Sequence, residues 1–128
     1  MAQKMVICDT NIMIEFFKGN PETTEDLRKI GFKNIGLSSI TFMELYQGMD
    51  NKRELNQIVR ALLPYKRIDI NRQASKLATE YLKRYYLSHS LQIPDAIIAA
   101  TAIAYNLELF TYNIKDFQFI PSIKLYKK

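Results

Sequence analysis

The sequence has little of several residue types that mark special classes of protein. It has one cysteine, Cys8, one histidine and no tryptophan among its 128 residues. A single cysteine cannot form an internal disulfide or supply a thiolate zinc site. The four glycines and four prolines are scattered, so no flexible linker divides the chain. We therefore expect one domain over residues 1–128, in a reducing compartment.

Long hydrophobic runs are also missing. The longest nearly apolar segment, residues 96–105, is well short of the roughly 18 residues that span a bilayer. The apolar segment 5–8 is ended by Asp9, which is too early for the core of a signal peptide. These observations predict a protein without a membrane segment that remains in the cytoplasm.

What is present is a globular composition with a basic surface. Hydrophobic residues make up 48% and charged residues 24%, which excludes an intrinsically disordered chain. The formal net charge of +5 favours an acidic partner such as nucleic acid, but many basic proteins share it. Charge therefore suggests a class of partner without identifying one.

Short apolar segments alternate with amphipathic ones. The apolar segments predict strands at residues 5–8, 35–38, 67–70, 108–110 and 123–125. Helices are predicted at 12–17, at 22–30, from Ser39 or Thr41 to Gly48, at 51–63, after Asn71 up to a loop at 88–93, and from Pro94 to Ala104. This order predicts an α/β fold whose short parallel sheet, of four to five strands, is flanked by helices on both faces.

Acidic residues follow or accompany the predicted strands. Asp9 comes directly after the first strand, and Asp116 lies shortly after the fourth. Asp95 begins the apolar helix that leads into the fourth strand, and Glu44 lies in the helix after the second. In parallel sheets, ligands bind beyond the carboxyl ends of the strands. We therefore expect the four carboxylates to lie near one edge of the sheet.

Converging carboxylates need a cation to remain ionised together. With one cysteine and one histidine, the ligands must be oxygen atoms, which suit Mg²⁺ or Mn²⁺. Asp9 also fits a helix cap, Asp95 a first-turn acid and Asp116 a turn residue. Glu44 has no such structural role on its apolar helix, and the joint placement of the four acids favours a metal site.

Four blocks of sequence carry a resemblance to a known family. They are DTNI at residues 9–12, ELYQG at 44–48, DAIIAATA at 95–102 and TYNIKDF at 111–117. Each block alone is weak, but together they occur in order and span almost the whole chain. The chain thus resembles the PIN domain, and specifically the small VapC-type toxins of prokaryotic toxin–antitoxin pairs.

The resemblance implies a Mg²⁺-dependent endoribonuclease, with Mn²⁺ as a substitute, that hydrolyses phosphodiester bonds with metal-activated water. By position, Asp9, Glu44 and Asp95 match the metal-binding acids, Asn113 matches a fourth polar ligand, and Asp116 matches a further catalytic and metal-binding acid. The supporting positions match Thr10, Asn11 and Thr111. Either Asp95 or Glu44 is the candidate to orient or deprotonate the attacking water.

The resemblance also implies partners: an RNA substrate, a cognate antitoxin and a second copy of the chain in a homodimer or a higher toxin–antitoxin assembly. Candidate RNA-binding cations are Arg53, Arg60, Lys66, Arg67, Arg72, Lys83 and Arg84, although each also fits a solvated surface. Tyr112 is a candidate for an interface or RNA contact, and His89 is expected alone in an exposed loop.

Two alternatives remain open. One is a catalytically inactive PIN-like module that binds RNA or protein, although acids that repel phosphate argue against it. The other is a PIN nuclease of RNA processing or DNA repair, which usually forms part of a longer chain. A neighbouring gene for a DNA-binding antitoxin would favour the toxin over this second alternative.

Overall fold

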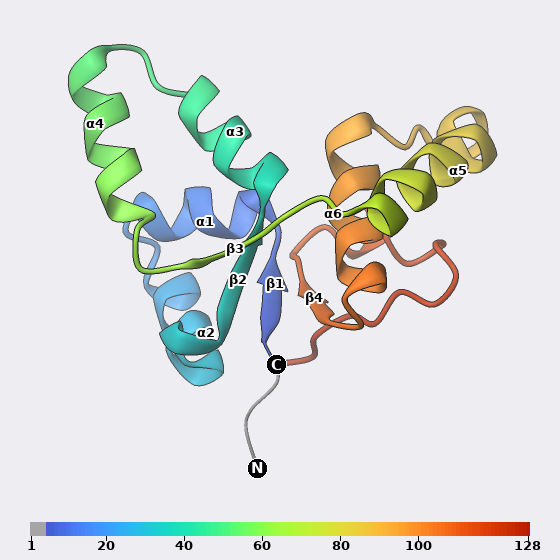
Figure 1. Cartoon of the computed structure of the whole chain (residues 1–128). Coiled ribbons are helices and arrows are strands. Elements are labelled where there is room, and N and C mark those ends of the chain that lie inside the picture. The colour runs from blue at the N-terminus through green and yellow to red at the C-terminus, as the bar shows by residue number, and fades with distance from the viewer. Residues whose placement is uncertain (1–4) are drawn as a thin grey trace.

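Alternating strands and helices make up residues 5–128, which the computed structural model describes; residues 1–4 of the expected domain lie outside the described part. Figure 1 shows the elements in order. They are β1 (Val6–Cys8), α1 (Thr10–Phe17), α2 (Pro21–Ile30), η1 (Phe32–Asn34), β2 (Ile35–Ser38), α3 (Ser39–Gln47), α4 (Lys52–Ala61), β3 (Lys66–Ile68), α5 (Arg72–His89), α6 (Ile93–Ala104), β4 (Glu108–Phe110) and η2 (Ile114–Asp116).

The strands form one parallel sheet in the order β3-β2-β1-β4. β1 lies in the interior, with Val6 opposite Ile35 on one side and Ile7 opposite Leu109 on the other. The three residues of β1 are buried because helices cover both faces of the sheet. The predicted α/β class, with a parallel sheet between helices, is confirmed.

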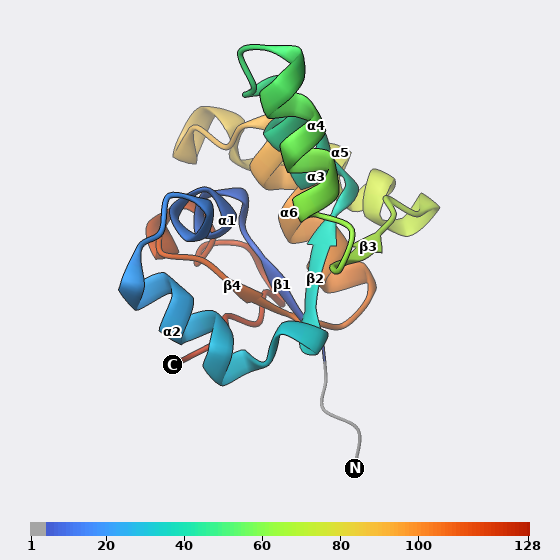
Figure 2. The same cartoon turned by 90° about the vertical axis from the view of Figure 1, so that its left-hand side faces the viewer.

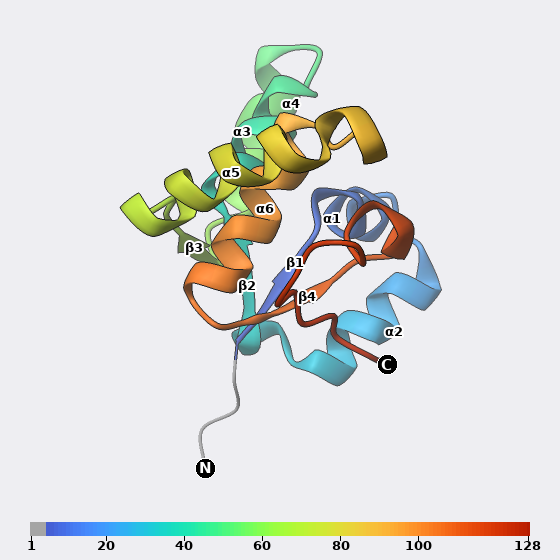
Figure 3. The same cartoon turned by 90° about the vertical axis from the view of Figure 1, so that its right-hand side faces the viewer.

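Successive residues of β1 point into two different hydrophobic cores, as the twofold repeat of a strand requires. Val6 and Cys8 pack in the core formed with α1, α2, α3 and α4, which Figure 2 shows on the near side of the sheet. Ile7 packs in the core formed with α5 and α6, which lie in front of the sheet in Figure 3. Cys8 is buried in the structure.

Polar side chains cap several helices, and Asn71 is the one among them that the sequence predicts as a cap. The carboxamide oxygens of Asn20, Asn51 and Asn71 each accept a backbone N–H from the first turn of α2, α4 and α5. The Ser38 hydroxyl does the same for α3. None of the helices in the described range 5–128 is long and apolar enough to cross a membrane.

Several boundaries differ from the sequence predictions; α1, for example, begins at Thr10 rather than at residue 12, and α4 ends at Ala61 rather than at residue 63. The predicted fifth strand at 123–125 makes only one isolated bridge, between Leu109 and Leu125, so the described sheet has four strands. β3 begins and ends slightly earlier than predicted. The expectation that His89 lies in a loop was wrong: His89 is the last residue of α5, and Ser90 after it has a left-handed backbone with a φ of 56°.

His89 remains the one histidine of the sequence, and it makes aromatic contacts at the end of α5. Its ring stacks on Phe119 with the ring centroids 4.1 Å apart, and it meets the edge of Tyr85 at 5.6 Å. These aromatic contacts attach the end of α5 to the C-terminal segment.

Replacement of Leu109 by alanine tests the role of β4 in the fold. Leu109 is fully buried between β1 and the α6 side of the core, so Leu109→Ala should lower the free energy of unfolding by about 2–5 kcal/mol in urea titrations. Leu87→Ala is the matched control because Leu87 is 92% exposed, and its effect should stay within about 0.5 kcal/mol. Equal losses in the two variants would contradict this account of the core.

Candidate functional site

The site lies where β1 and β4 end side by side. β1 connects onward to β2 on one side, whereas β4, formed much later in the chain, pairs with its other side. Ligands of open parallel sheets bind at such a switch in strand order. The Asp9 N–H donates to the Phe110 carbonyl at 2.9 Å, which extends the pairing past the end of β1. Asp9 and Thr111 are thereby brought next to each other.

Asp9 occupies the N-cap position of α1 but does not cap the helix. Its side chain makes no capping hydrogen bond and is only 4% exposed. The Thr111 hydroxyl instead donates to Asp9 Oδ2 at 2.8 Å and accepts the Asn113 backbone N–H at 3.0 Å. The interpretation of Asp9 as a helix cap is therefore wrong, and Thr111 both orients its carboxylate and begins the following loop.

Glu44 is oriented by hydroxyl groups rather than by a cation. The Thr10 hydroxyl donates to Glu44 Oε1 at 2.7 Å, so it accepts from the Thr41 hydroxyl, 2.9 Å away. Thr10 and Thr41 are both buried. Sequence reasoning missed Thr41, although its position three residues before Glu44 places both on one face of α3.

Asp95 lies in the first turn of α6, where it is partly buried. Burial, together with the negative charges of Asp9, Asp116 and Glu44, raises the pKa of Asp95 to about 7. Burial also raises the pKa of Asp9, and Glu44 and Asp116 add to this rise while the Thr111 hydrogen bond opposes it. The structure thus brings these four acids into one electrostatic neighbourhood, which we call the acidic edge.

The acidic edge is not a closed metal cage. Among residues 5–128, no three Asp, Glu, His or Cys side chains lie close enough together to hold an ion as they stand. The donor chemistry still fits a hard divalent cation, because carboxylates that raise one another's pKa are stabilised in their charged forms by a cation. Mg²⁺ keeps several water ligands in proteins and is commonly held by only one or two carboxylates.

Three of the predicted site residues, one of them an acid of the acidic edge, lie at the surface of the protein. Asn11, Asn113 and Asp116 are exposed, and Asn113 precedes η2 without capping it through its side chain. Asn113 and Asp116 line a shallow cavity of about 410 Å³ together with Tyr112, Ile114 and Lys115. These side chains are accessible from solvent on the loop of residues 111–116, hereafter the 111–116 loop.

The candidate RNA-binding cations are all exposed, on α4, β3 and α5. Three of them have neighbours within the chain: Arg67 pairs with Asp69 at 3.1 Å, Lys83 pairs with Glu80 at 3.5 Å, and Arg84 lies over the Tyr85 ring. Exposed ion pairs contribute only about 0–1 kcal/mol, so these cations can exchange partners for phosphate. Their contact with RNA stays a prediction.

Fold and acidic edge together define an α/β domain with a candidate metal-binding edge, and comparison with known proteins identifies its family. The family model of the PIN domain matches residues 6–120. Ribonuclease VapC2 of Rickettsia felis is 33% identical over 125 residues, which cover 91% of this chain and 92% of that protein.

Solved structures agree with the sequence comparison. A chain of the toxin–antitoxin complex from Klebsiella pneumoniae is 31% identical, with a TM-score of 0.77 over 96% of this chain and 99% of that one. A chain of VapBC2 from Rickettsia felis, solved bound to a DNA fragment from its promoter, is also 31% identical, with a TM-score of 0.78 over 95% of this chain and 97% of its own. The protein belongs to the PIN-domain family and, within it, to the VapC group, which confirms the resemblance carried by the four sequence blocks.

The raised pKa of Asp95 predicts how stability depends on pH. The unfolded carboxyl ionises near its ordinary value of 3.8, whereas the folded one ionises near 7, so folding loses stability as the pH rises between these values. Asn cannot ionise. In a chelator, Asp95→Asn should therefore melt at a higher temperature than the parent at pH 8, and the difference should shrink at pH 4.

Differential scanning calorimetry at the two pH values measures this effect. Asp50→Asn is the control, because it makes the same chemical change at an exposed acid just before α4. If Asp95→Asn and Asp50→Asn shift the melting temperature alike at pH 8, burial and repulsion do not act on Asp95 as described.

Proposed function

We propose that this protein is an endoribonuclease that acts as the toxin of a toxin–antitoxin pair and depends on Mg²⁺, with Mn²⁺ as a substitute. The observation that carries the proposal is the acidic edge at the ends of β1 and β4, in a chain of the PIN-domain family. Its relatives bear the name ribonuclease VapC, and we extend that activity to this chain.

In this proposal, Asp9, Glu44 and Asp95 hold the divalent ion, and Asn113 and Asp116 complete the site from the 111–116 loop. Asp9 and Glu44 reach it with orientations set by the Thr111 and Thr10 hydroxyls. When bound, the ion supplies water activation and neutralises charge on the phosphate. Asp95 or Glu44 orients the attacking water or takes its proton. Asn11 stays a supporting residue beside these acids, and the exposed cations of α4, β3 and α5 contribute to holding the RNA.

An antitoxin is the proposed protein partner, since the similar solved structures are toxin–antitoxin complexes. Exposed apolar side chains offer surface for an antitoxin segment or for a homodimer, among them Leu63 just after α4 and Tyr86 and Leu87 on α5. We further propose that residues 1–128 act as one PIN domain, in the cytoplasm where the RNA substrate is found.

Cleavage of total RNA by purified, antitoxin-free protein tests the activity. Mg²⁺ or Mn²⁺ should support cleavage and a chelator should abolish it. Asp9→Asn and Asp95→Asn should each reduce the rate by at least about 100-fold, because each loses a charged oxygen ligand. Glu25→Gln is the control, since Glu25 is exposed on α2 and pairs with Arg28 on the same helix, and it should cleave at the parental rate.

The outcomes separate the proposal from its alternative. A folded protein that neither binds Mn²⁺ nor cuts any RNA would exclude the nuclease and leave an inactive binding module. Cleavage that persists in chelator, or in both Asp variants, would show that the acidic edge is not the catalytic site.

A further inference from the structure

A second buried carboxylate lies outside the acidic edge. Asp26, on α2, is only 6% exposed, and among residues 5–128 it shares this degree of burial with one other acid, Asp9. A buried carboxylate is unfavourable unless other groups satisfy it. The proposed chemistry makes no use of Asp26, so the groups that surround it indicate what it does.

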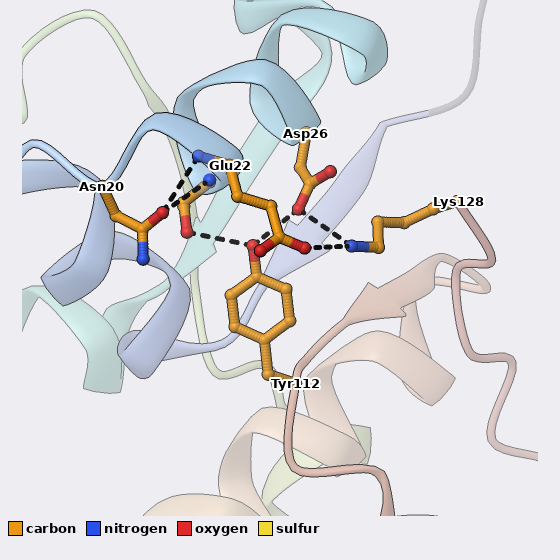
Figure 4. A network of polar contacts seen from close by, with 6 residues as sticks. Asn20, Glu22, Asp26, Tyr112 and Lys128 are labelled. Carbon is orange, nitrogen blue, oxygen red and sulfur yellow. Dashed lines mark hydrogen bonds and ion pairs between the residues drawn. The ribbon is translucent and has the colours of Figure 1, made fainter.

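Tyr112 is the closest of these groups, as Figure 4 shows. The Tyr112 hydroxyl donates to Asp26 Oδ2 at 2.6 Å and, its proton being used there, accepts from the Thr23 hydroxyl at 3.0 Å. An O–H to carboxylate bond of this length is charge-assisted and strong. Two residues of α2 thus hold one phenol oxygen from the 111–116 loop.

Lys128 adds a positive charge to the same cluster. Its ammonium group lies 3.3 Å from Asp26 Oδ2 and 3.2 Å from Glu22 Oε1, and 5.5 Å from the centroid of the Tyr112 ring. Asn20 fixes the start of α2 by accepting the N–H groups of Glu22 and Thr23 (Figure 4). The two α2 partners of the Tyr112 hydroxyl therefore lie on a helix whose start is itself held in place.

Tyr112 lies between residues that face the acidic edge. Thr111, before it, donates to Asp9, and Asn113, after it, donates its N–H back to Thr111. The Tyr112 ring packs edge-on against Phe110 at 5.3 Å, at the end of β4. The loop that carries Asn113 and Asp116 is consequently tied on one side to Asp9 and on the other to α2.

We propose that Tyr112, through its bonds to Thr23 and Asp26, is a positioning residue that holds the 111–116 loop against α2 and thereby sets the geometry of the acidic edge. The inference rests on the proposed function, since it assigns Tyr112 a part in metal binding. The hydrogen bonds of the Tyr112 hydroxyl keep the Thr111 hydroxyl on Asp9 and keep Asn113 and Asp116 beside the other acids. Tyr112 itself is not one of the proposed metal-binding residues.

Tyr112→Phe tests the inference because it removes the hydroxyl and keeps the ring. Hydrogen exchange should become faster at the Asn113 amide, the Kd for Mn²⁺ measured by calorimetry should rise about tenfold, and kcat should fall while KM changes little. Tyr126→Phe is the matched control, since Tyr126 also packs edge-on against Phe110 but no hydrogen bond of its hydroxyl is found within residues 5–128. It should match the parent in all three measurements.

Two further variants separate the hydrogen bond from charge and from folding. Asp26→Asn keeps an oxygen that accepts from Tyr112, so its effect on Mn²⁺ binding should be smaller than that of Tyr112→Phe. Thr23→Val removes the second partner of the phenol with little change in shape, and it should shift the same measurements in the same direction. It also serves in place of Tyr112→Phe if that variant fails to fold.

The results distinguish failure of this inference from failure of the proposed function. If the parent binds Mn²⁺ and cleaves RNA, but a folded Tyr112→Phe variant keeps its Asn113 exchange rate and its Kd, the positioning role is wrong and the nuclease stands. A lower melting temperature with unchanged Kd and kcat would show a purely structural tie and also overturn the inference. If the parent itself binds no Mn²⁺, the proposed function fails and this role falls with it.

Discussion

The pairing of β1 with β4 is the constraint on which the rest of the site depends. These strands are separated by about a hundred residues of chain, yet the Asp9 N–H bonds to the Phe110 carbonyl and the Thr111 hydroxyl bonds to the Asp9 carboxylate. Because both strands are parallel, their carboxyl ends lie at the same edge. The site residues from the second half of the chain are placed either by this pairing, as Thr111 and Asp116 are, or by the preceding helix α6, which carries Asp95.

Neutral hydroxyl groups orient two of the acids. Hydroxyl groups of Thr10 and Thr111 direct Glu44 and Asp9, and no ion pair to either of these two acids is found in the described chain. A lysine or arginine at this position would neutralise the carboxylates and occupy the place of a cation. Hydroxyl donors hold the oxygens without supplying a positive charge, so the negative field of the acidic edge is preserved. Burial, with this negative field added to it, raises the pKa of Asp95.

Much of the fold was predictable from local pattern. Short apolar segments bounded by Asn, Asp and Gly gave β1, β2 and β4 nearly at their observed bounds, and Asn20, Asn51 and Asn71 begin helices as their chemistry requires. The segment 123–125 looks like a strand for the same reason, since Ile123 and Leu125 are apolar. It makes a single isolated bridge, from Leu125 to Leu109, because pairing depends on where a neighbouring strand lies, and local apolarity does not carry that information.

The sequence by itself determined the acids, their order and the family they indicate, because residue type and strand-end position are local properties. Only the tertiary structure decided which groups orient them. Thr41 reaches Thr10 from another helix, and Asp26 and Lys128 meet Tyr112 from segments far apart in sequence. From the sequence, the Asp9 side chain fitted either a helix cap or a metal site. In the structure it accepts a hydrogen bond from Thr111 and does not cap α1. Hydrogen bonds between distant segments depend on how the sheet and helices pack, so they cannot be predicted from the spacing of residues along the chain.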